Sequence, residues 1–240
     1  MSEAPSQSKS EPAVDKPHHG TGHRSRLRKR LAEGGPDALL DHEIIEYLLA
    51  LAIPRRDVKP LAKQLITRFD SLGGVLTAEW SELERVEGLG ETSVAALKIV
   101  QAAALRMLSN DVRKKPVLSS WQALLDYLRL DMAYLSVERV RVLHLNSGNM
   151  LLRDDNMGEG SIDEAAIYAR EVAKRVLQYG SASIILVHNH PSGVPEPSRQ
   201  DIAITKQIID ALKPLGVAVH DHVIIGSQGH RSLRALGLMS

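Results

Sequence analysis

The sequence predicts two folded parts, an all-α part followed by a layered α/β part. Apolar residues recur at helical spacing from about residue 38 to 108, and a run with charge, Pro and Ser interrupts them at Arg113–Ser120. Strand-like and helical segments then alternate to the end of the chain. The 240 residues can form one large domain or two small ones with a real core. Aromatic residues make up 3% of the chain, so we expect this core to be aliphatic.

The N-terminal segment, residues 1–22, is rich in Ser, Pro, Glu and Lys, and we expect it to be disordered. A basic run follows at His23–Leu31 and includes Arg26 and Arg28. A solvated helix face and a nucleic-acid contact explain this run about equally well. The segment lacks the apolar core of a signal peptide, and no apolar run approaches the roughly 18 residues of a membrane span. We therefore expect a cytoplasmic protein without a membrane partner.

Residues 23–112 are expected to form the helical domain. Asp41 precedes apolar residues at helical spacing, which predicts that it is an N-cap, and Pro54 ends this helix. Asp57 is expected to cap the next helix. Pro60 then lies in the first turn, where a missing N–H is tolerated.

The segment VEGLGETSVAAL, Val86–Leu97, resembles a helix-hairpin-helix motif. Gly88 and Gly90 fit its glycine turn, which exposes backbone N–H groups that suit a phosphate oxygen. Glu91, however, stands where DNA-binding hairpins often have a basic residue. Two hypotheses therefore stay open. The turn and the basic run bind DNA weakly and without sequence specificity, or the motif is only a helical packing unit.

The second domain is expected over residues 118–240 and mixes helices with strands. Its elements in order are a helix, a hairpin, a helix, a buried strand, a helix and a second buried strand, at residues 121–132, 140–152, 163–180, 181–188, 201–216 and 217–226.

A candidate metal site lies where the first buried strand ends. His188 and His190 are one residue apart, so in extended chain both side chains point to one face, at the strand's carboxyl end. Asp201 lies at the N-terminus of the next expected helix, whose first turn can bring the carboxylate back over the strand end. The chain has no cysteine, which leaves His, Asp and Glu as the plausible ligands. These three ligands and a water suit a catalytic zinc, whereas a polar loop with Asp201 as an N-cap is the alternative.

The stretch HNHPSGVPEPSRQD, His188–Asp201, resembles the JAMM signature of the JAB1/MPN/Mov34 metalloenzymes at each fixed position. The pattern is H-x-H-P, six residues, Ser, two residues and Asp. The surrounding segments IILVHNHPSG, PSRQDIAITK and VHDHVIIG are similar to the bacterial RadC family of the UPF0758 type. This similarity covers nearly the whole chain from about His23.

The resemblance implies a three-layer JAB1/MPN domain with a cytidine-deaminase-like fold. It also implies one Zn²⁺ per chain, bound by His188, His190 and Asp201, and an amide hydrolase or metallopeptidase whose protein or peptide substrate is unknown. Ser198 is then implied to hydrogen-bond the developing oxyanion or the water on the metal.

The proton carrier is less clearly marked in the sequence. The JAMM enzymes use a glutamate upstream of the histidines, and in the stretch LLRDDNMGEGSID this chain has Asp155 at that position and Ser161 in place of a threonine. Because aspartate is one methylene shorter, Glu159 is the alternative, and a third explanation is that both are solvated loop acids. Asp221 and His222 match the family's Asp-His pair, which either orients a zinc-bound imidazole or satisfies a buried loop.

Two function hypotheses follow from these residues. The first is a zinc-dependent amide hydrolase. The second is a DNA-binding accessory protein in repair or recombination, in which the zinc domain is not catalytic. A nuclease is a weaker third hypothesis, because one site of neutral imidazoles suits an amide carbonyl better than a two-metal phosphodiester mechanism.

Overall fold

A computed structural model of the chain describes residues 19–159 and 165–239, so residues 1–18 of the predicted tail lie outside the described residues. Residues 19–22 were also expected to be disordered, but they form the start of a helix. The helices are α1 (His19–Gly34), α2 (Asp41–Ala52), α3 (Lys59–Phe69), α4 (Leu72–Thr77), α5 (Trp80–Glu84), α6 (Glu91–Lys114), α7 (Trp121–Met132), α8 (Ala165–Tyr179) and α9 (Arg199–Leu212). The strands are β1 (Arg139–Leu145), β2 (Leu151–Glu159), β3 (Ser183–Asn189), β4 (Ala218–Gly226) and β5 (Gly229–Ser232). Short 3₁₀ turns lie at Pro36–Ala38, Val117–Ser120 and Lys213–Leu215.

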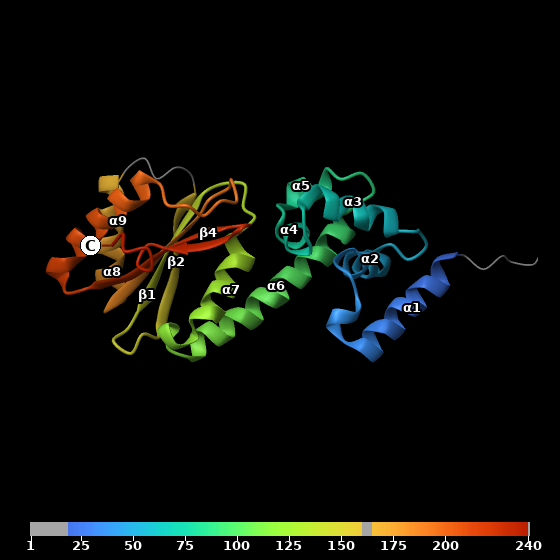
Figure 1. The fold of residues 1–240 in the computed structure, drawn as a ribbon, viewed down its shortest axis with the longest axis horizontal. Helices are drawn as coiled ribbons and strands as arrows, with labels where there is room; N and C mark the ends of the chain where they lie inside the picture. Colours follow the sequence, from blue (N-terminus) through green and yellow to red (C-terminus); the bar gives the residue numbers. More distant parts are fainter. Residues whose placement is uncertain (1–18, 160–164, 240) are drawn as a thin grey trace, which may run out of the picture.

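Helices α1 to α5 and the first half of α6 form the all-α part (Figure 1). Its core is aliphatic, as expected, and includes Ile45, Leu49, Leu65, Leu83, Val94 and Leu97. These residues come from α2, α3, α5 and α6. Each of these helices buries one apolar face in this shared core, which holds them together.

Both predicted N-caps are displaced by one residue from the N-caps in the structure, which are Leu40 and Val58. The prediction for Asp41 is wrong, because Asp41 is already the first residue of α2. The Glu43 carboxylate instead accepts a hydrogen bond from the Leu40 N–H at 2.9 Å and satisfies one of the unpaired donors of the first turn. Asp57 lies one residue before the N-cap of α3, which is Val58, but its Oδ1 does accept from the N–H of Lys59, the first residue of the helix, at 3.0 Å.

Helix α6 connects the two parts (Figure 1). Val94 and Leu97, in its first turns, are buried in the helical core, whereas Val112, near its end, is buried in a second core with residues of the sheet. The break in the sequence pattern at Arg113–Ser120 therefore coincides with the end of α6, and the passage from one core to the other lies inside the helix.

The C-terminal part has three layers. The five strands run in the order β2-β1-β3-β4-β5, with β3 and β4 parallel and the other neighbours antiparallel. Helices α8 and α9 pack against the face that carries Val142 and Leu186, and α7 packs against the face that carries Leu143 and Val187. Because both faces of β3 are covered, the strand is buried along its whole length, which explains its aliphatic run.

The predicted hairpin forms from β1 and β2. Asn146 Oδ1 accepts hydrogen bonds from the N–H groups of Gly148 and Met150, and Asn149 adopts a positive φ of 59° in the turn. Strand β2 continues as far as Glu159, beyond the predicted hairpin, so Asp155 is a strand residue and is buried. The edge strand β5 was not predicted. Among the helices that the structure describes, none is long and apolar enough to cross a membrane.

Candidate metal centre

The two histidines lie at the carboxyl end of β3, as expected. His188 is fully buried and pairs with Val140 of β1 and Ile224 of β4. His190 follows the strand, and its N–H donates to the Ile225 carbonyl at 2.8 Å, so the chain stays extended across both residues. The two Nε2 atoms are 3.0 Å apart, which places both rings on one face of the sheet.

Asp201 comes to the same point from the first turn of α9. Its Oδ1 is 3.2 Å from His188 Nε2, and its Oδ2 is 3.5 Å from His190 Nε2. The ligand atoms of the three residues all lie within 4.8 Å of one another. The structure therefore brings the three residues that the sequence singled out into one group that could hold a metal ion.

The hydrogen bonds of the rings show which nitrogen faces this point. His190 Nδ1 is 2.9 Å from the Val194 carbonyl, which only accepts, so Nδ1 carries the proton and the lone pair lies on Nε2. His188 turns its Nδ1 to His222 Nε2, at 2.8 Å, and its Nε2 to Asp201. Two imidazole nitrogens and a carboxylate converge at hydrogen-bond distance, a donor set that fits zinc.

The charges of the site agree with this interpretation. Burial raises the pKa of the Asp201 carboxyl, but the neighbouring His188 and His190 rings and the Ser198 hydroxyl outweigh it and hold the pKa below its usual range. The adjacent Asp201 carboxylate raises the pKa of His190 against the opposing effect of burial. Among the described residues, Asp201 has no ion pair with a lysine or arginine, so the imidazoles are its nearest source of compensating charge.

Ser198 is the N-cap of α9 and contacts one of the candidate ligands. Its Oγ and its N–H both donate to Asp201 Oδ2 at 2.7 Å, and the Asp201 N–H donates back to Ser198 Oγ at 3.1 Å. This reciprocal capping box fixes the first turn of the helix and the direction of the Asp201 carboxylate. Ser198 as a whole is exposed, and its hydroxyl contacts the candidate ligand Asp201.

Asp155 lies apart from this group. Strand β1 separates β2 from β3, and Asp155 pairs with Val142, which in turn pairs with Leu186 rather than with His188. Arg175 of α8 donates to Asp155 Oδ2 at 2.6 Å, so the carboxylate has a cation of its own. Glu159 is the last residue of β2, and the prediction for its side chain lies outside the described residues, as does Ser161.

The two residues of the Asp-His pair, Asp221 and His222, have different contacts. Asp221 accepts from the N–H groups of His222 and Arg234 and from the Ser232 hydroxyl, which fastens β4 to the chain after β5. His222 contacts His188 directly, and Thr205 of α9, which the sequence analysis missed, contacts His222 in turn. Its position four residues after Asp201, one helical turn along α9, is the feature of the sequence that could have indicated Thr205.

The glycine turn and the basic run lie in the helical part. Gly88 has a positive φ of 93°, and a Cβ there would meet the Arg56 guanidinium at 3.1 Å, so Arg56 packs directly against the turn. Gly90 is the N-cap of α6. Of the two arginines proposed for nucleic-acid contact, Arg26 lines a pocket between α1 and α3, whereas Arg28 is exposed and does not line it.

Comparison with known proteins adds the family. Residues 118–238 match the family described as RadC-like JAB domain, and residues 21–95 match the one described as UPF0758 N-terminal. A UPF0758 protein of Rhodobacter capsulatus is 48% identical over 213 residues, which cover 89% of this chain and the whole of that protein. The chain belongs to the UPF0758 family. Its histidine–aspartate group lies in the RadC-like JAB domain, a domain of the JAMM/MPN type.

The two matched regions of this UPF0758 protein correspond to its two parts. The N-terminal match ends within the first turns of α6, at residue 95, and the JAB match begins at residue 118 in the 3₁₀ turn before α7. The second half of α6 lies between them. The match at both ends confirms the resemblance on which the sequence analysis rested.

Proposed function

We propose that this protein is a zinc-dependent amide hydrolase whose substrate is a protein or peptide. The observation that carries the proposal is the convergence of His188, His190 and Asp201 on one point, with ring nitrogens facing each other 3.0 Å apart. A cation between these groups removes the repulsion between their lone pairs. Bound there, zinc lowers the pKa of a coordinated water to about 7 and polarises a carbonyl.

The site is accessible from one side. The side chains of His188 and Asp201 are at most 5% exposed, whereas that of His190 is 19% exposed. Substrate therefore approaches over His190, between the loop that follows it and the exposed Ser198. In this geometry Ser198 is placed to donate to the oxygen of a scissile carbonyl once it turns from Asp201.

Of the two candidates for the proton carrier, Glu159 has its backbone closer than Asp155 to the row of the sheet that contains His188. Val140 pairs with His188 on one side and with Gly158, the neighbour of Glu159, on the other. Asp155 lies on a different row of the sheet, and its Oδ2 is engaged by the Arg175 guanidinium at 2.6 Å. We therefore assign the transfer of a proton from water to the leaving amine to Glu159.

A peptide-library cleavage assay tests the proposal. Wild-type protein is expected to cut peptides in a reaction that a chelator abolishes and added zinc restores. Ser198→Ala is expected to lower the rate about a hundredfold to a thousandfold while zinc stays bound. Glu159→Gln is expected to stop turnover, with Asp155→Asn as the matched control that retains it. Zinc at one ion per chain with no cleavage would overturn the hydrolase and leave a zinc-binding module.

A second candidate function, nucleic-acid binding by the helical part, is supported by one pocket. A cavity of about 230 Å³ between α1 and the start of α3 is lined by four cationic side chains, Arg24, Arg26, Arg56 and Lys59. The acids Glu46 and Asp57 also line it. Arg24 is bound to the carbonyls of Ile53, Pro54 and Arg56, which leaves the other three cations to face a phosphate.

Measurements of salt-dependent DNA binding can distinguish a contribution of this pocket from one of the exposed basic run. Arg26→Glu and Arg56→Glu are expected to abolish a weak, non-specific affinity, because each reverses a charge that faces the phosphate. Arg28→Glu, which lies outside the pocket, is the matched control and should lower the affinity less. Equal effects of all three variants would mean that only the overall charge of the helical part matters.

A further inference from the structure

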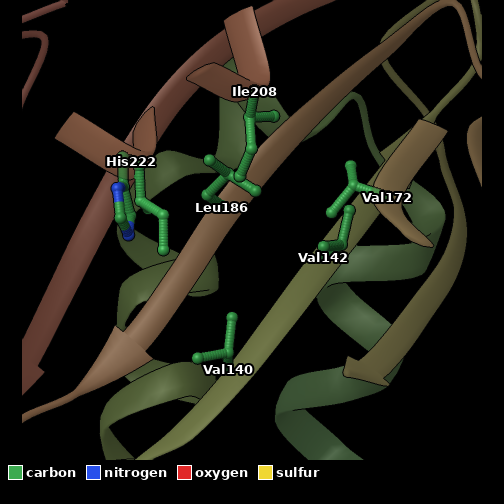
Figure 2. A pocket seen from close by; sticks show the side chains of 7 residues that line it. Val140, Val142, Val172, Leu186, Ile208 and His222 are labelled. Atoms are coloured by element: carbon green, nitrogen blue, oxygen red, sulfur yellow. The ribbon is translucent and has the colours of Figure 1, made fainter. Parts of the chain in front are cut away.

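His222 is buried between two hydrogen-bonding partners and an aliphatic wall. Its side chain has 2% exposure, with Nε2 2.8 Å from His188 Nδ1 and Nδ1 2.5 Å from Thr205 Oγ1. The rest of the ring faces a cavity of about 10 Å³ (Figure 2). Figure 2 shows the other side chains that line it, Val140, Val142, Val172, Leu186 and Ile208. This wall offers the ring nitrogens no alternative partner.

The hydroxyl of Thr205 determines the direction of the first hydrogen bond. Thr205 lies four residues after Asp201 on α9, and its Oγ1 donates to the Asp201 carbonyl at 2.5 Å, as threonines in helices commonly do. A hydroxyl has one proton to donate. Once that proton is on the Asp201 carbonyl, the oxygen can only accept from His222, so the proton of the His222 ring lies on Nδ1.

The same reasoning fixes the next ring. With its proton on Nδ1, a neutral His222 carries a lone pair on Nε2 and accepts from His188 Nδ1–H. His188 then has its own lone pair on Nε2, the atom that is 3.2 Å from Asp201 Oδ1 and 3.0 Å from His190 Nε2. The chain of hydrogen bonds thus begins at the backbone carbonyl of Asp201 and ends beside its carboxylate.

We infer that Thr205 is a positioning residue that sets, through His222, the protonation of His188, so that His188 Nε2 is free to bind a metal ion. The inference rests on the proposed metal site and adds to it a hydrogen-bonded relay, Thr205–His222–His188, that connects two of its ligands. The relay also ties the first turn of α9 to β4 and β3, so both ligand-bearing elements keep one geometry.

Removal of the hydroxyl should reverse the relay. In Thr205→Val the side chain keeps its shape, but His222 Nδ1 loses its acceptor. The His222 proton then moves to Nε2, where it faces His188 Nδ1 and drives the His188 proton to Nε2, the nitrogen that faces Asp201. Zinc must displace that proton, and loss of an outer-sphere partner of this kind typically costs about 10–100-fold in metal affinity.

Nuclear magnetic resonance of the full chain with ¹⁵N-labelled histidine tests the relay without metal. In the wild type, the rings of His222 and His188 are both expected to be protonated on Nδ1. Thr205→Val is expected to shift both protons to Nε2, and Thr205→Ser to restore the wild-type pattern. Unchanged ring protonation in folded Thr205→Val would overturn the inference. Because the measurement uses metal-free protein, it remains decisive even if the wild type binds no zinc, a result that would overturn only the proposed function.

Zinc titration, with cobalt(II) as a coloured substitute, gives the second readout. Thr205→Val is expected to bind about 10–100-fold more weakly than the wild type, and Thr205→Ser as tightly. Thr77→Val is the matched control, because the buried Thr77 hydroxyl also donates to the carbonyl four residues earlier, Gly73, in the helical part. Affinity in Thr205→Val equal to that of Thr77→Val would overturn the inference. If Thr205→Val does not fold, loss of affinity in a folded His222→Gln supports it, and wild-type affinity overturns it.

Discussion

One face of the sheet carries two histidine–aspartate pairs with opposite ways of balancing charge. His188 and Asp201 lie at the carboxyl end of β3, and His144 and Asp155 lie toward the other end of the same face, under α8. Asp155 has its cation within the protein, the Arg175 guanidinium at 2.6 Å. Asp201 has only imidazoles among the described residues.

The difference separates a structural carboxylate from a candidate ligand when both are buried beside a histidine. His144 Nδ1 contacts the Ser181 hydroxyl at 2.8 Å, and its Nε2 lies 3.9 Å from Asp155 Oδ2, too far for a hydrogen bond. In the His144 pair the carboxylate has its own counter-ion beside a neutral ring. In the Asp201 pair the described residues supply no lysine or arginine, so a bound metal ion would complete the set.

The largest expected difference between the pairs concerns metal content. Asp201→Asn should abolish zinc binding, because it removes a charged ligand, a greater loss than the roughly 10–100-fold that an outer-sphere partner costs. Asp155→Asn should keep one zinc per chain. Elemental analysis of the purified variants measures both, and equal zinc in the two would erase the distinction between the pairs.

The pH dependence of stability should depend on His144. Burial lowers the pKa of His144 from 6.5 to about 4. The neutral ring therefore contributes stability that is complete above pH 6.5 and is lost as the pH falls toward 4, in total about 3 kcal/mol. Denaturant unfolding of wild type and His144→Leu at several pH values measures this difference. If the free energy of unfolding changed equally with pH between 6.5 and 4 in both proteins, His144 would not be held neutral.

The counter-ion of Asp155 should contribute to stability and not to metal binding. Breaking a buried ion pair costs about 3–5 kcal/mol. Because the Arg175 side chain is 32% exposed, we expect about 1–2 kcal/mol for Arg175→Met, with zinc unchanged. Lys174→Met removes the neighbouring pair with Glu171, whose lysine is 70% exposed, and should cost less than about 0.5 kcal/mol. A loss of zinc in Arg175→Met would show that the contacts of Asp155 also affect metal binding, and would contradict this prediction.

A smaller effect than that of Arg175→Met is expected at the cap of α9. Ser198→Ala removes the side-chain acceptor of the Asp201 N–H and should lower the free energy of unfolding by about 1 kcal/mol. Ser198→Thr keeps an N-cap hydroxyl and should restore it. Thermal unfolding with zinc removed isolates the cap from the metal. No change in Ser198→Ala would mean that the capping box adds nothing to the stability of the first turn.

Local spacing made the candidate ligands plausible, because the period of a strand puts His188 and His190 on one face and a helix start returns Asp201 to them. The resemblance to the JAMM signature then selected this group over a polar loop with a capped helix. The layers of the second part followed from similar periodicities. The partners of buried polar groups did not follow, since they depend on contacts between distant segments. The ion pair of Asp155 with Arg175 requires β2 to bury Asp155 under α8, and the contact of Thr205 with His222 requires α9 to cross β4.

The mistaken N-cap at Asp41 has a similar cause. Sequence pattern shows where a helix begins only to within a residue or two. At α2 the choice was decided by Glu43, whose carboxylate accepts from the Leu40 N–H and is held by Arg30 of α1 at 2.7 Å. A side chain thirteen residues away in the sequence thus helps to set the first turn.

The continuous helix α6 also acts as a spacer of fixed length. Its 24 residues correspond to about 36 Å of rise. Because its first turns are buried in one core and Val112 in the other, neither part can swing freely on a flexible hinge inside the helix. Anything held by the helical part is therefore presented to the RadC-like JAB domain at a set distance and orientation.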